Sequence, residues 1–463
     1  MKFPQIPKAY GSIVQDLDSK RLATILPQSE SVSSHDEYLH WNELRRRPVP
    51  DGLTHDEWWF LVKLGRNTKL RSIPLRDKAG QAFQLSLPDR LLEQLHHIDR
   101  GLGAVWNLPE PVTNPATRNE YVINSLIEES ITSSQLEGAV TTREVAKQML
   151  LSRRQPRDTS ERMVLNNYLT MLHIMDLKGK PLSPELVFEL HQRVTDGTLD
   201  KSDAAGRFRH PDEQVRVMDM EGTVFHEPPP ASELPDRLVA MCAFANGQTP
   251  DFFIHPVVRA IILHFWLAYD HPFVDGNGRT ARALFYWAML HQGFTLFEFI
   301  SISEILLRAP SRYAMSFLHT ETDANDLTYF ILYQAEVIQK AVVALHDYVA
   351  EKTARMQQLE RCLRGMDDLN HRQQSLLAHA LRNPDMRYTI EGHKNSNGVA
   401  YQTARTDLLD LAERGLLVGY KRSKALVFRP VADLQERLPG LASAPLPKTD
   451  ENATLPLGFR PES

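Results

Sequence analysis

Residues 271–282 read HPFVDGNGRTAR, and they are the most informative stretch of this 463-residue chain. Pro272 ends an apolar run of helical period, which predicts a helix over residues 256–269. Gly276 and Gly278 permit a tight turn whose backbone N–H groups can converge on an anion. A second amphipathic helix is predicted over residues 279–291, and its N-terminus would direct the positive end of its dipole into the turn. The stretch therefore predicts two helices joined by a phosphate-binding turn.

Four charged or titratable side chains in and beside this turn are suited to bind phosphate and metal and to transfer a proton. Arg279 and Arg282 are three residues apart on one helix face, where they can clamp two successive phosphates. Asp275 is the only carboxylate of the turn, and a hard oxygen ligand beside phosphates suits magnesium. His271 titrates near neutrality and can accept a proton from an incoming hydroxyl. The alternative is a purely structural helix start, but such a start needs only a cap and not this set of residues.

The stretch resembles the HPFx[D/E]GNGRxxR signature of Fic domains, with every defining position present. Most Fic proteins with the full signature transfer AMP from ATP to a Ser, Thr or Tyr hydroxyl of a target protein and release pyrophosphate. The resemblance implies that His271 is the general base. It also implies that Asp275 holds Mg²⁺.

The same resemblance assigns the remaining residues of the turn. It implies that Asn277 and the two glycines, Gly276 and Gly278, position the phosphates, and that Arg279 and Arg282 bind the β- and γ-phosphates. A neighbouring branch, typified by the Doc toxin, runs ATP in the opposite orientation and phosphorylates its target. The turn of that branch lacks the second glycine, so Gly278 favours adenylylation.

A second motif, Ser133-Ser134-Gln135-Leu136-Glu137-Gly138, closes an amphipathic run that predicts a helix over residues 114–138. It resembles the inhibitory [S/T]xxxE[G/N] motif of Fic proteins, in which Ser133 and Glu137 are defining positions. The resemblance implies that Glu137 pairs with Arg282 and occupies the room that the γ-phosphate needs. An ordinary solvated helix end is the alternative.

Residues between the two motifs predict a β-hairpin. An alternating segment over residues 214–218 is followed by turn residues 219–222 and a short apolar segment over residues 223–225. Together with Gly206-Arg207-Phe208-Arg209 and His226-Glu227-Pro228-Pro229-Pro230, it resembles the flap of Fic domains. The resemblance implies that Val215, Arg216 and Val217 hold a target segment by strand addition and present its hydroxyl to His271. An ordinary surface hairpin is the alternative.

Three aromatic or imidazole side chains near the signature are also of interest. Ser311-Arg312-Tyr313-Ala314 resembles the region that borders the adenine ring in Fic domains, which implies that Tyr313 is a wall of that pocket; a core tyrosine is the alternative. His191 and His264 lie on predicted apolar helices without cysteine or carboxylate partners at ligand spacing, so we expect structural roles for both.

The C-terminal part has a different pattern. A predicted helix over residues 371–382 is followed by a short polar segment (388–397), Gly398 as a turn, a second helix (401–414) and two short strands around residues 421–424. This order resembles a winged helix-turn-helix. Residues 370–430 carry ten Lys and Arg against five Asp and Glu, which favours nucleic acid. If the module binds DNA, the side chains near the major groove would be Tyr401, Gln402, Thr403 and Arg405. The side chains that meet phosphates would be Lys421, Arg422 and Lys424. A scaffold role is the alternative.

Composition limits the class of protein. A hydrophobic content of 42% suffices for packed cores, and no apolar run reaches membrane-spanning length, so a soluble protein with no membrane partner is expected. The first residues lack a signal-type apolar segment, and Cys242 and Cys362 lack metal or redox spacing, which favours a cytoplasmic location. The net charge of −5 excludes neither protein nor nucleic-acid partners.

The predicted fold is mainly α: a Fic fold, which is a helical core with a β-hairpin flap, plus a winged-helix α+β module and an N-terminal extension. The predicted parts are an N-terminal extension (1–110), a Fic catalytic domain (111–365) that contains the inhibitory helix (114–138), a winged helix (370–432) and a weakly ordered tail (438–463).

The leading functional hypothesis is a self-inhibited protein adenylyltransferase that uses ATP and Mg²⁺ to modify a target protein, including itself. One alternative is a DNA-binding transcriptional regulator whose Fic core senses nucleotide. Another is a de-AMPylating enzyme, in which Glu137 aligns a water. The target, the choice among ATP, UTP and other nucleotides, the direction of AMP transfer and the oligomeric state, including a homodimer, are left open by the sequence.

Overall fold

The computed structural model describes residues 2–34, 37–103, 115–218, 222–366, 368–384, 386–422 and 425–438. The described residues are mainly helical, as predicted, and they form three small sheets, of which the one in the N-terminal part was not predicted. The chain divides into two compact units, Met1–Asn107 with Tyr121–Leu345, and Leu108–Glu120 with His346–Ser463. Within the described residues, no helix is both long and apolar enough to cross a membrane.

The N-terminal part of the first unit is a small helical bundle followed by a hairpin. Its core is built around Trp59 and Phe60, which are buried, with Trp58 partly buried against them. Thr54 caps the longest helix of the bundle, because its hydroxyl accepts from Glu57 N and its own N–H donates to the Glu57 carboxylate. The elements are α1 (Tyr10–Asp16), α2 (Ser19–Ile25), η1 (Leu26–Gln28), α3 (Ser29–Ser34), α4 (Trp41–Leu44), α5 (His55–Asn67), β1 (Arg71–Arg76), β2 (Ala82–Leu85) and α6 (Asp89–Gly103).

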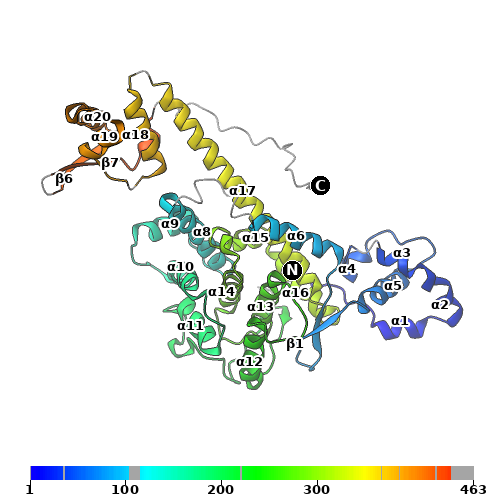
Figure 1. The fold of residues 1–463 in the computed structure, drawn as a ribbon. Helices are drawn as coiled ribbons and strands as arrows, with labels where there is room; N and C mark the ends of the chain where they lie inside the picture. Colours follow the sequence, from blue (N-terminus) through cyan, green and yellow to red (C-terminus); the bar gives the residue numbers. More distant parts are fainter. Residues whose placement is uncertain are drawn as a thin grey trace. The chain divides into compact units, whose positions relative to one another are not determined.

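The remainder of the first unit is a helical core that surrounds α13 (Pro256–Asp270) and α14 (Asn277–His291). These two helices pack against each other, and α10 (Thr159–Leu177) and α11 (Pro184–Thr195) pack on α14 (Figure 1). Both central helices are apolar and buried nearly all round, which is typical of helices at the centre of a domain. The predicted bounds of both helices are confirmed to within two residues, but α14 is buried nearly all round and not amphipathic as expected. The other elements are α8 (Pro115–Leu136), α9 (Arg143–Ser152), η3 (Ser202–Ala204), η4 (Ala231–Glu233), α12 (Leu234–Ala245), η5 (Thr295–Phe299), α15 (Ile302–Arg308), α16 (Pro310–Thr322) and α17 (Thr328–Arg364), the last of which extends into the second unit.

The predicted helix over residues 114–138 is close to α8, which ends at Leu136. Gly138 follows with a φ of +91°, a backbone conformation that favours glycine. Asn114, the predicted start, lies outside the described residues. The next helix, α9, is capped by Thr142, whose hydroxyl accepts from Val145 N at 3.3 Å.

The predicted hairpin is present but shorter than expected. β3 (Val217–Met218) pairs antiparallel with β4 (Val224–His226), and an irregularity lies between residues 217 and 218. Of the predicted flap residues, only Val217 lies in a strand; Val215 and Arg216 precede it, which corrects the expected strand over residues 214–218. Residues 219–221 of the predicted turn lie outside the described residues.

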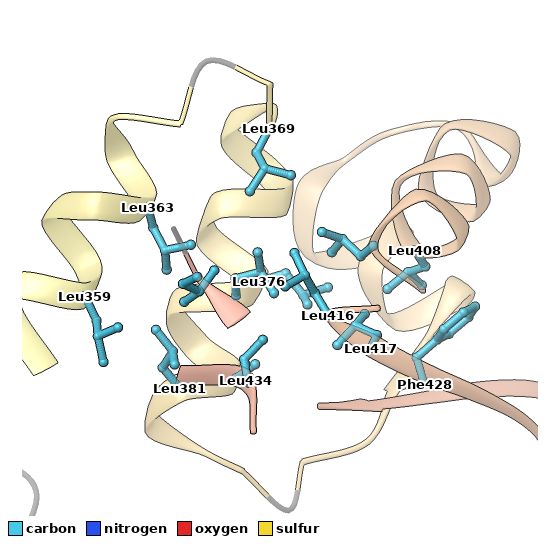
Figure 2. Close-up of a cluster of buried hydrophobic side chains, with 14 of the residues drawn as sticks. Leu359, Leu363, Leu369, Leu376, Leu381, Leu408, Leu416, Leu417, Phe428 and Leu434 are labelled. Atoms are coloured by element: carbon cyan, nitrogen blue, oxygen red, sulfur yellow. The ribbon is translucent and has the colours of Figure 1, made fainter. Parts of the chain in front are cut away.

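The second unit contains, after the end of α17, the elements α18 (His371–Arg382), β5 (Tyr388–Thr389), α19 (Ile390–Asn397), α20 (Tyr401–Glu413), β6 (Leu417–Arg422), β7 (Ala425–Pro430) and α21 (Leu434–Arg437). The sheet is antiparallel with strand order β5-β7-β6. Leucines of α17, α18 and α20 and Phe428 of β7 converge in one core (Figure 2). Ser423, Lys424 and the tail from residue 439 lie outside the described residues.

The sequence assigned no helix or strand to the polar segment 388–397, but the structure shows regular elements there. The segment contains a strand and then helix α19, which Thr389 caps by accepting from Gly392 N at 3.0 Å. Gly398 ends the helix with a φ of +63°. The helix contains Gly392 and three Asn or Ser residues, which are poor helix formers, so tertiary packing of Ile390 and His393 outweighs propensity here.

Candidate functional site: an anion-binding turn between two buried helices

The turn between α13 and α14 is ordered by hydrogen bonds and close packing. Asn277 spans the turn, because its amide accepts from Phe273 N (3.0 Å) and donates to Phe273 O (2.8 Å). Gly276, with a φ of +80°, ends the turn and begins α14. A Cβ at residue 276 would lie 2.5 Å from the Thr195 methyl group, so only glycine fits.

His191 supports this turn from α11 and has the structural role that was expected. Its Nδ1 accepts from Gly206 N at 3.0 Å, so Nε2 carries the hydrogen and donates to the carbonyl oxygen of Asp275 at 2.9 Å. Its ring stacks on Phe273, with centroids 3.6 Å apart. Burial lowers the pKa of His191 to about 4, which keeps the ring neutral, as these two hydrogen bonds require.

His271 lies at the C-terminus of α13 in the left-handed conformation, with φ 44° and ψ 55°. Its Nδ1 lies 3.2 Å from the carbonyl oxygen of Ala268, which can only accept, so Nδ1 is the donor and Nε2 keeps its lone pair. Burial lowers the pKa of His271 to about 4. The imidazole is therefore neutral near pH 7, with one nitrogen available as a base.

Arg209 is a residue of the site whose role the sequence did not predict. Its Nε donates to the carbonyl oxygen of His271 at 2.9 Å, its Nη2 donates to the carbonyl oxygen of Pro229, and its backbone N–H donates to that of Pro272 at 2.9 Å. It therefore joins the strained residue His271 to the segment that follows the hairpin. The only sequence signal was its place in the Gly206-Arg207-Phe208-Arg209 segment.

The hairpin is joined to the same helix end by His226. Its Nε2 lies 2.7 Å from the carbonyl oxygen of Tyr269, and its Nδ1 lies 2.8 Å from the carboxylate of Glu321. Val217 is 38% exposed, and Arg216 is exposed with its guanidinium 3.3 Å from Glu227. The hairpin is thus attached to the end of α13 through His226, and Arg216 and Val217 face solvent.

Both arginines of the signature are buried, at 0% and 1% exposure. Arg279 donates to the carbonyl oxygen of Val194 (2.9 Å) and to the carboxylate of Asp275 (3.2 Å). Its Nε has no hydrogen-bond partner in the described part of the chain, which leaves a buried donor. Arg282 is bound to Ser133 of α8: its Nε donates to Ser133 Oγ (2.8 Å) and its Nη2 to Ser133 O (2.8 Å).

Glu137 lies on the turn itself. Its Oε1 is 3.0 Å from Arg282 Nη1. A Cβ built on Gly278 would lie 2.0 Å from the same oxygen, so the carboxylate rests directly against the backbone at the start of α14. The predicted residues Ser133, Glu137, Gly278 and Arg282 are therefore brought together, although the two motifs are more than 130 residues apart in the chain.

Tyr313 lies on α16 beside this group. Its hydroxyl is 2.8 Å from His264 Nε2, and burial raises the pKa of Tyr313 well above its usual range, with Arg282 opposing the shift. The tyrosine therefore borders the arginine end of the site. Buried His264 is its structural partner, which agrees with the role expected for that histidine.

Asp275 is the exposed carboxylate of the turn, with a side chain 54% accessible. Its Oδ1 accepts from Gly276 N at 2.6 Å and its Oδ2 from Arg279, which orients the carboxylate beside the anion position. No group of three or more His, Cys, Asp or Glu side chains that could hold a metal ion occurs among the described residues. One carboxylate fits Mg²⁺ that takes its other ligands from phosphates and water.

Comparison with known proteins agrees with this arrangement. Residues 181–289 match the model of the Fic/DOC family. A protein adenylyltransferase Fic of Nematostella vectensis is 28% identical over 176 residues, which are 38% of this chain and 36% of that protein. A protein of the same name from Drosophila virilis is 34% identical over 130 residues, 26% of this chain and 24% of that one. The chain thus spans about a third or less of the length of these relatives.

A solved structure supports the fold. A Fic family protein from Desulfovibrio desulfuricans G20 covers 75% of this chain and 97% of its own, with a TM-score of 0.51 and 18% identity. Together with the family match, this supports a Fic domain in the helical core of the first unit.

Proposed function

We propose that this protein is a self-inhibited protein adenylyltransferase, which transfers AMP from ATP to a Ser, Thr or Tyr hydroxyl of a target protein. The observation that carries the proposal is the place of the Glu137 carboxylate, against Gly278 and 3.0 Å from Arg282. A helix N-terminus with a buried arginine is a site for phosphate oxygens, and the carboxylate occupies that site. The two relatives from Nematostella vectensis and Drosophila virilis are named as protein adenylyltransferases, which supports the same activity.

The proposed reaction gives each residue a step that its position allows. The target hydroxyl oxygen attacks the α-phosphorus of ATP, the bond from that phosphorus to the β-bridging oxygen breaks, and pyrophosphate leaves. His271 takes the hydroxyl proton at Nε2, because its Nδ1 is engaged by Ala268. Arg209 fixes the His271 backbone, and the flap residue Val217 offers a strand edge to the target segment.

The phosphates are assigned to the start of α14. Backbone N–H groups at Gly278 and the buried guanidinium of Arg279 would bind the β-phosphate, and Arg282 would bind the γ-phosphate once Glu137 moves aside. Asp275 would hold Mg²⁺ together with phosphate oxygens. When bound, the metal neutralises charge on the leaving pyrophosphate, so the protein mainly positions the reactants.

This assignment predicts that transfer depends on magnesium and on Asp275. In a Glu137→Gly background, Asp275→Asn should lower the initial rate of labelling from α-labelled ATP about tenfold or more at limiting Mg²⁺, with partial recovery at high Mg²⁺. Asp176→Asn, which removes an exposed carboxylate of α10, is the matched control and should have no effect. Equal labelling in Mg²⁺ and in EDTA, with Asp275→Asn unimpaired, would contradict the assignment.

A second function is proposed for residues 370–432, as a winged helix that binds DNA. The order α18, β5, α19, α20, β6, β7 and the antiparallel sheet favour this fold. Tyr401, Gln402 and Arg405 lie exposed at the start of α20, the position of a recognition helix, whereas Thr403 is half-buried. Lys421 is exposed on β6, as a wing residue that meets phosphates should be.

The DNA-binding hypothesis predicts retention of duplex DNA by the full chain at low salt. Arg405→Ala and Lys421→Ala should each weaken retention, and each should make the salt dependence shallower by about one phosphate contact. Lys180→Ala, which changes an exposed lysine of the first unit, should leave retention unchanged. Electrophoretic mobility shifts over a salt series measure this. Absence of retention at low salt would leave a scaffold role for the module.

A further inference from the structure

Glu129 is a buried carboxylate for which neither the sequence motifs nor the proposed chemistry has a use. It lies on α8, four residues before Ser133, so these two side chains share one face of the helix, and Glu137 follows directly after the helix ends at Leu136. Glu129 is only 1% exposed. A carboxylate is rarely buried so completely unless other groups satisfy it.

Four hydrogen bonds satisfy the Glu129 carboxylate. Its Oε2 accepts from Tyr286 Oη (2.8 Å), Ser301 Oγ (2.9 Å) and Ser303 N (3.0 Å), and its Oε1 accepts from Ser303 Oγ (2.5 Å). Tyr286 lies on α14, and the two serines lie at the start of α15. One side chain therefore fastens α8 to both the helix that carries Arg282 and the segment beyond it.

These contacts fix where α8 lies along the core. A shift or rotation of α8 would leave a buried carboxylate and several buried donors without partners, which is costly. The Glu137 carboxylate meets Arg282 and Gly278 from the position that directly follows the same helix. Because Glu137 adjoins the end of the helix, its position depends on how firmly the helix is held.

We propose that Glu129 is a positioning residue for inhibition, which holds α8 so that Glu137 stays in the anion-binding turn. The inference rests on the proposed function, and it assigns a regulatory role to a residue outside the inhibitory motif. Loss of the Glu129 hydrogen bonds lowers the fraction of molecules in which Glu137 occupies the turn. The enzyme then becomes more active, although it becomes less stable.

A purely structural role would give the opposite sign, because a destabilised enzyme loses activity. The test therefore compares Glu129→Ala and the milder Ser303→Ala with Glu128→Ala. Glu128 is the adjacent carboxylate of α8. It pairs with Arg143 of α9 (2.6 Å), so it takes no part in the hydrogen bonds of Glu129. Each substitution is made in the wild-type chain and in Glu137→Gly.

We expect Glu129→Ala to raise the initial rate of AMP incorporation from α-labelled ATP about tenfold, and Ser303→Ala to raise it less, in the otherwise wild-type chain. Neither substitution should raise the rate further in Glu137→Gly, because Glu129 acts through Glu137. Glu128→Ala should not raise it. Thermal melting establishes that each variant is folded, and Ser303→Ala decides the result if Glu129→Ala does not fold.

Amide hydrogen exchange of residues 130–137 provides a readout that does not depend on activity. Exchange should become faster in Glu129→Ala and Ser303→Ala and not in Glu128→Ala. Unchanged exchange, a gain in rate that persists in Glu137→Gly, or an equal gain in Glu128→Ala would overturn the inference. A Glu137→Gly protein that transfers no AMP overturns the proposed function instead, and the exchange measurement still decides whether Glu129 anchors the helix.

Discussion

Replacing Glu137 by glycine should raise AMP incorporation from ATP about tenfold to a hundredfold, since a charge-assisted pair between carboxylate and guanidinium is worth about 1.5–3 kcal/mol. The substitution removes the oxygen that lies against Gly278 and frees Arg282 Nη1, while Ser133 still holds the rest of that guanidinium. The initial rate of labelling by α-labelled ATP, with the chain's own hydroxyls as acceptors, measures the gain.

Glu137→Gln separates charge from volume in this experiment. The amide keeps the size of the side chain but loses the ion pair with Arg282, so we expect a rate between those of wild type and Glu137→Gly. Equal rates in all three proteins would show that the carboxylate does not restrain transfer. A lower rate in Glu137→Gly would mean that Glu137 assists the reaction.

Replacing His271 by alanine in the Glu137→Gly background should lower AMP incorporation by about two to four orders of magnitude, the usual contribution of a general base. In the proposed mechanism the imidazole is the base: its Nδ1 is engaged by Ala268, which leaves Nε2 to take the proton, and burial lowers its pKa to about 4, so the ring is unprotonated at neutral pH. The control is His173→Ala, which removes a partly buried histidine that pairs with Glu189 away from the turn.

ATP binding distinguishes a catalytic loss at His271 from a folding defect. His271→Ala should bind ATP nearly as well as its parent, because the histidine is placed to act on the hydroxyl and not on the triphosphate. A rate that is unchanged by the substitution would remove the histidine from the mechanism. Loss of ATP binding together with a lower melting temperature would indicate collapse of the turn.

The sequence predicts well those features of the site that depend on residues close together in the chain. Pro272, Gly276 and Gly278 determine where α13 ends and α14 begins, because φ restriction and glycine's freedom act within a few residues. The helix periods on both sides are strong, so their bounds are predicted to within two residues. The pairing of Glu137 with Arg282 was predicted only through the resemblance of two separate motifs.

What the sequence does not predict depends on contacts between distant residues. Arg209 reaches His271 across 62 positions and Ser303 reaches Glu129 across 174, and no local pattern encodes such pairs. Helix α19 was missed because its polar, glycine-containing sequence has low helix propensity and its packing on the second-unit core outweighs that preference. The strand residues of the flap were overestimated because alternation continues beyond the residues that are paired.

If the turn at the head of α14 binds a triphosphate so that His271 directs a hydroxyl to the α-phosphorus, the position of the label in ATP decides whether protein is labelled. Glu137→Gly is incubated in parallel with α-labelled and with γ-labelled ATP, and protein-bound label is measured with His271 present and with His271→Ala. We expect label from the α position only, and only when His271 is present. Label from the γ position, or α-label that persists in His271→Ala, would contradict this expectation.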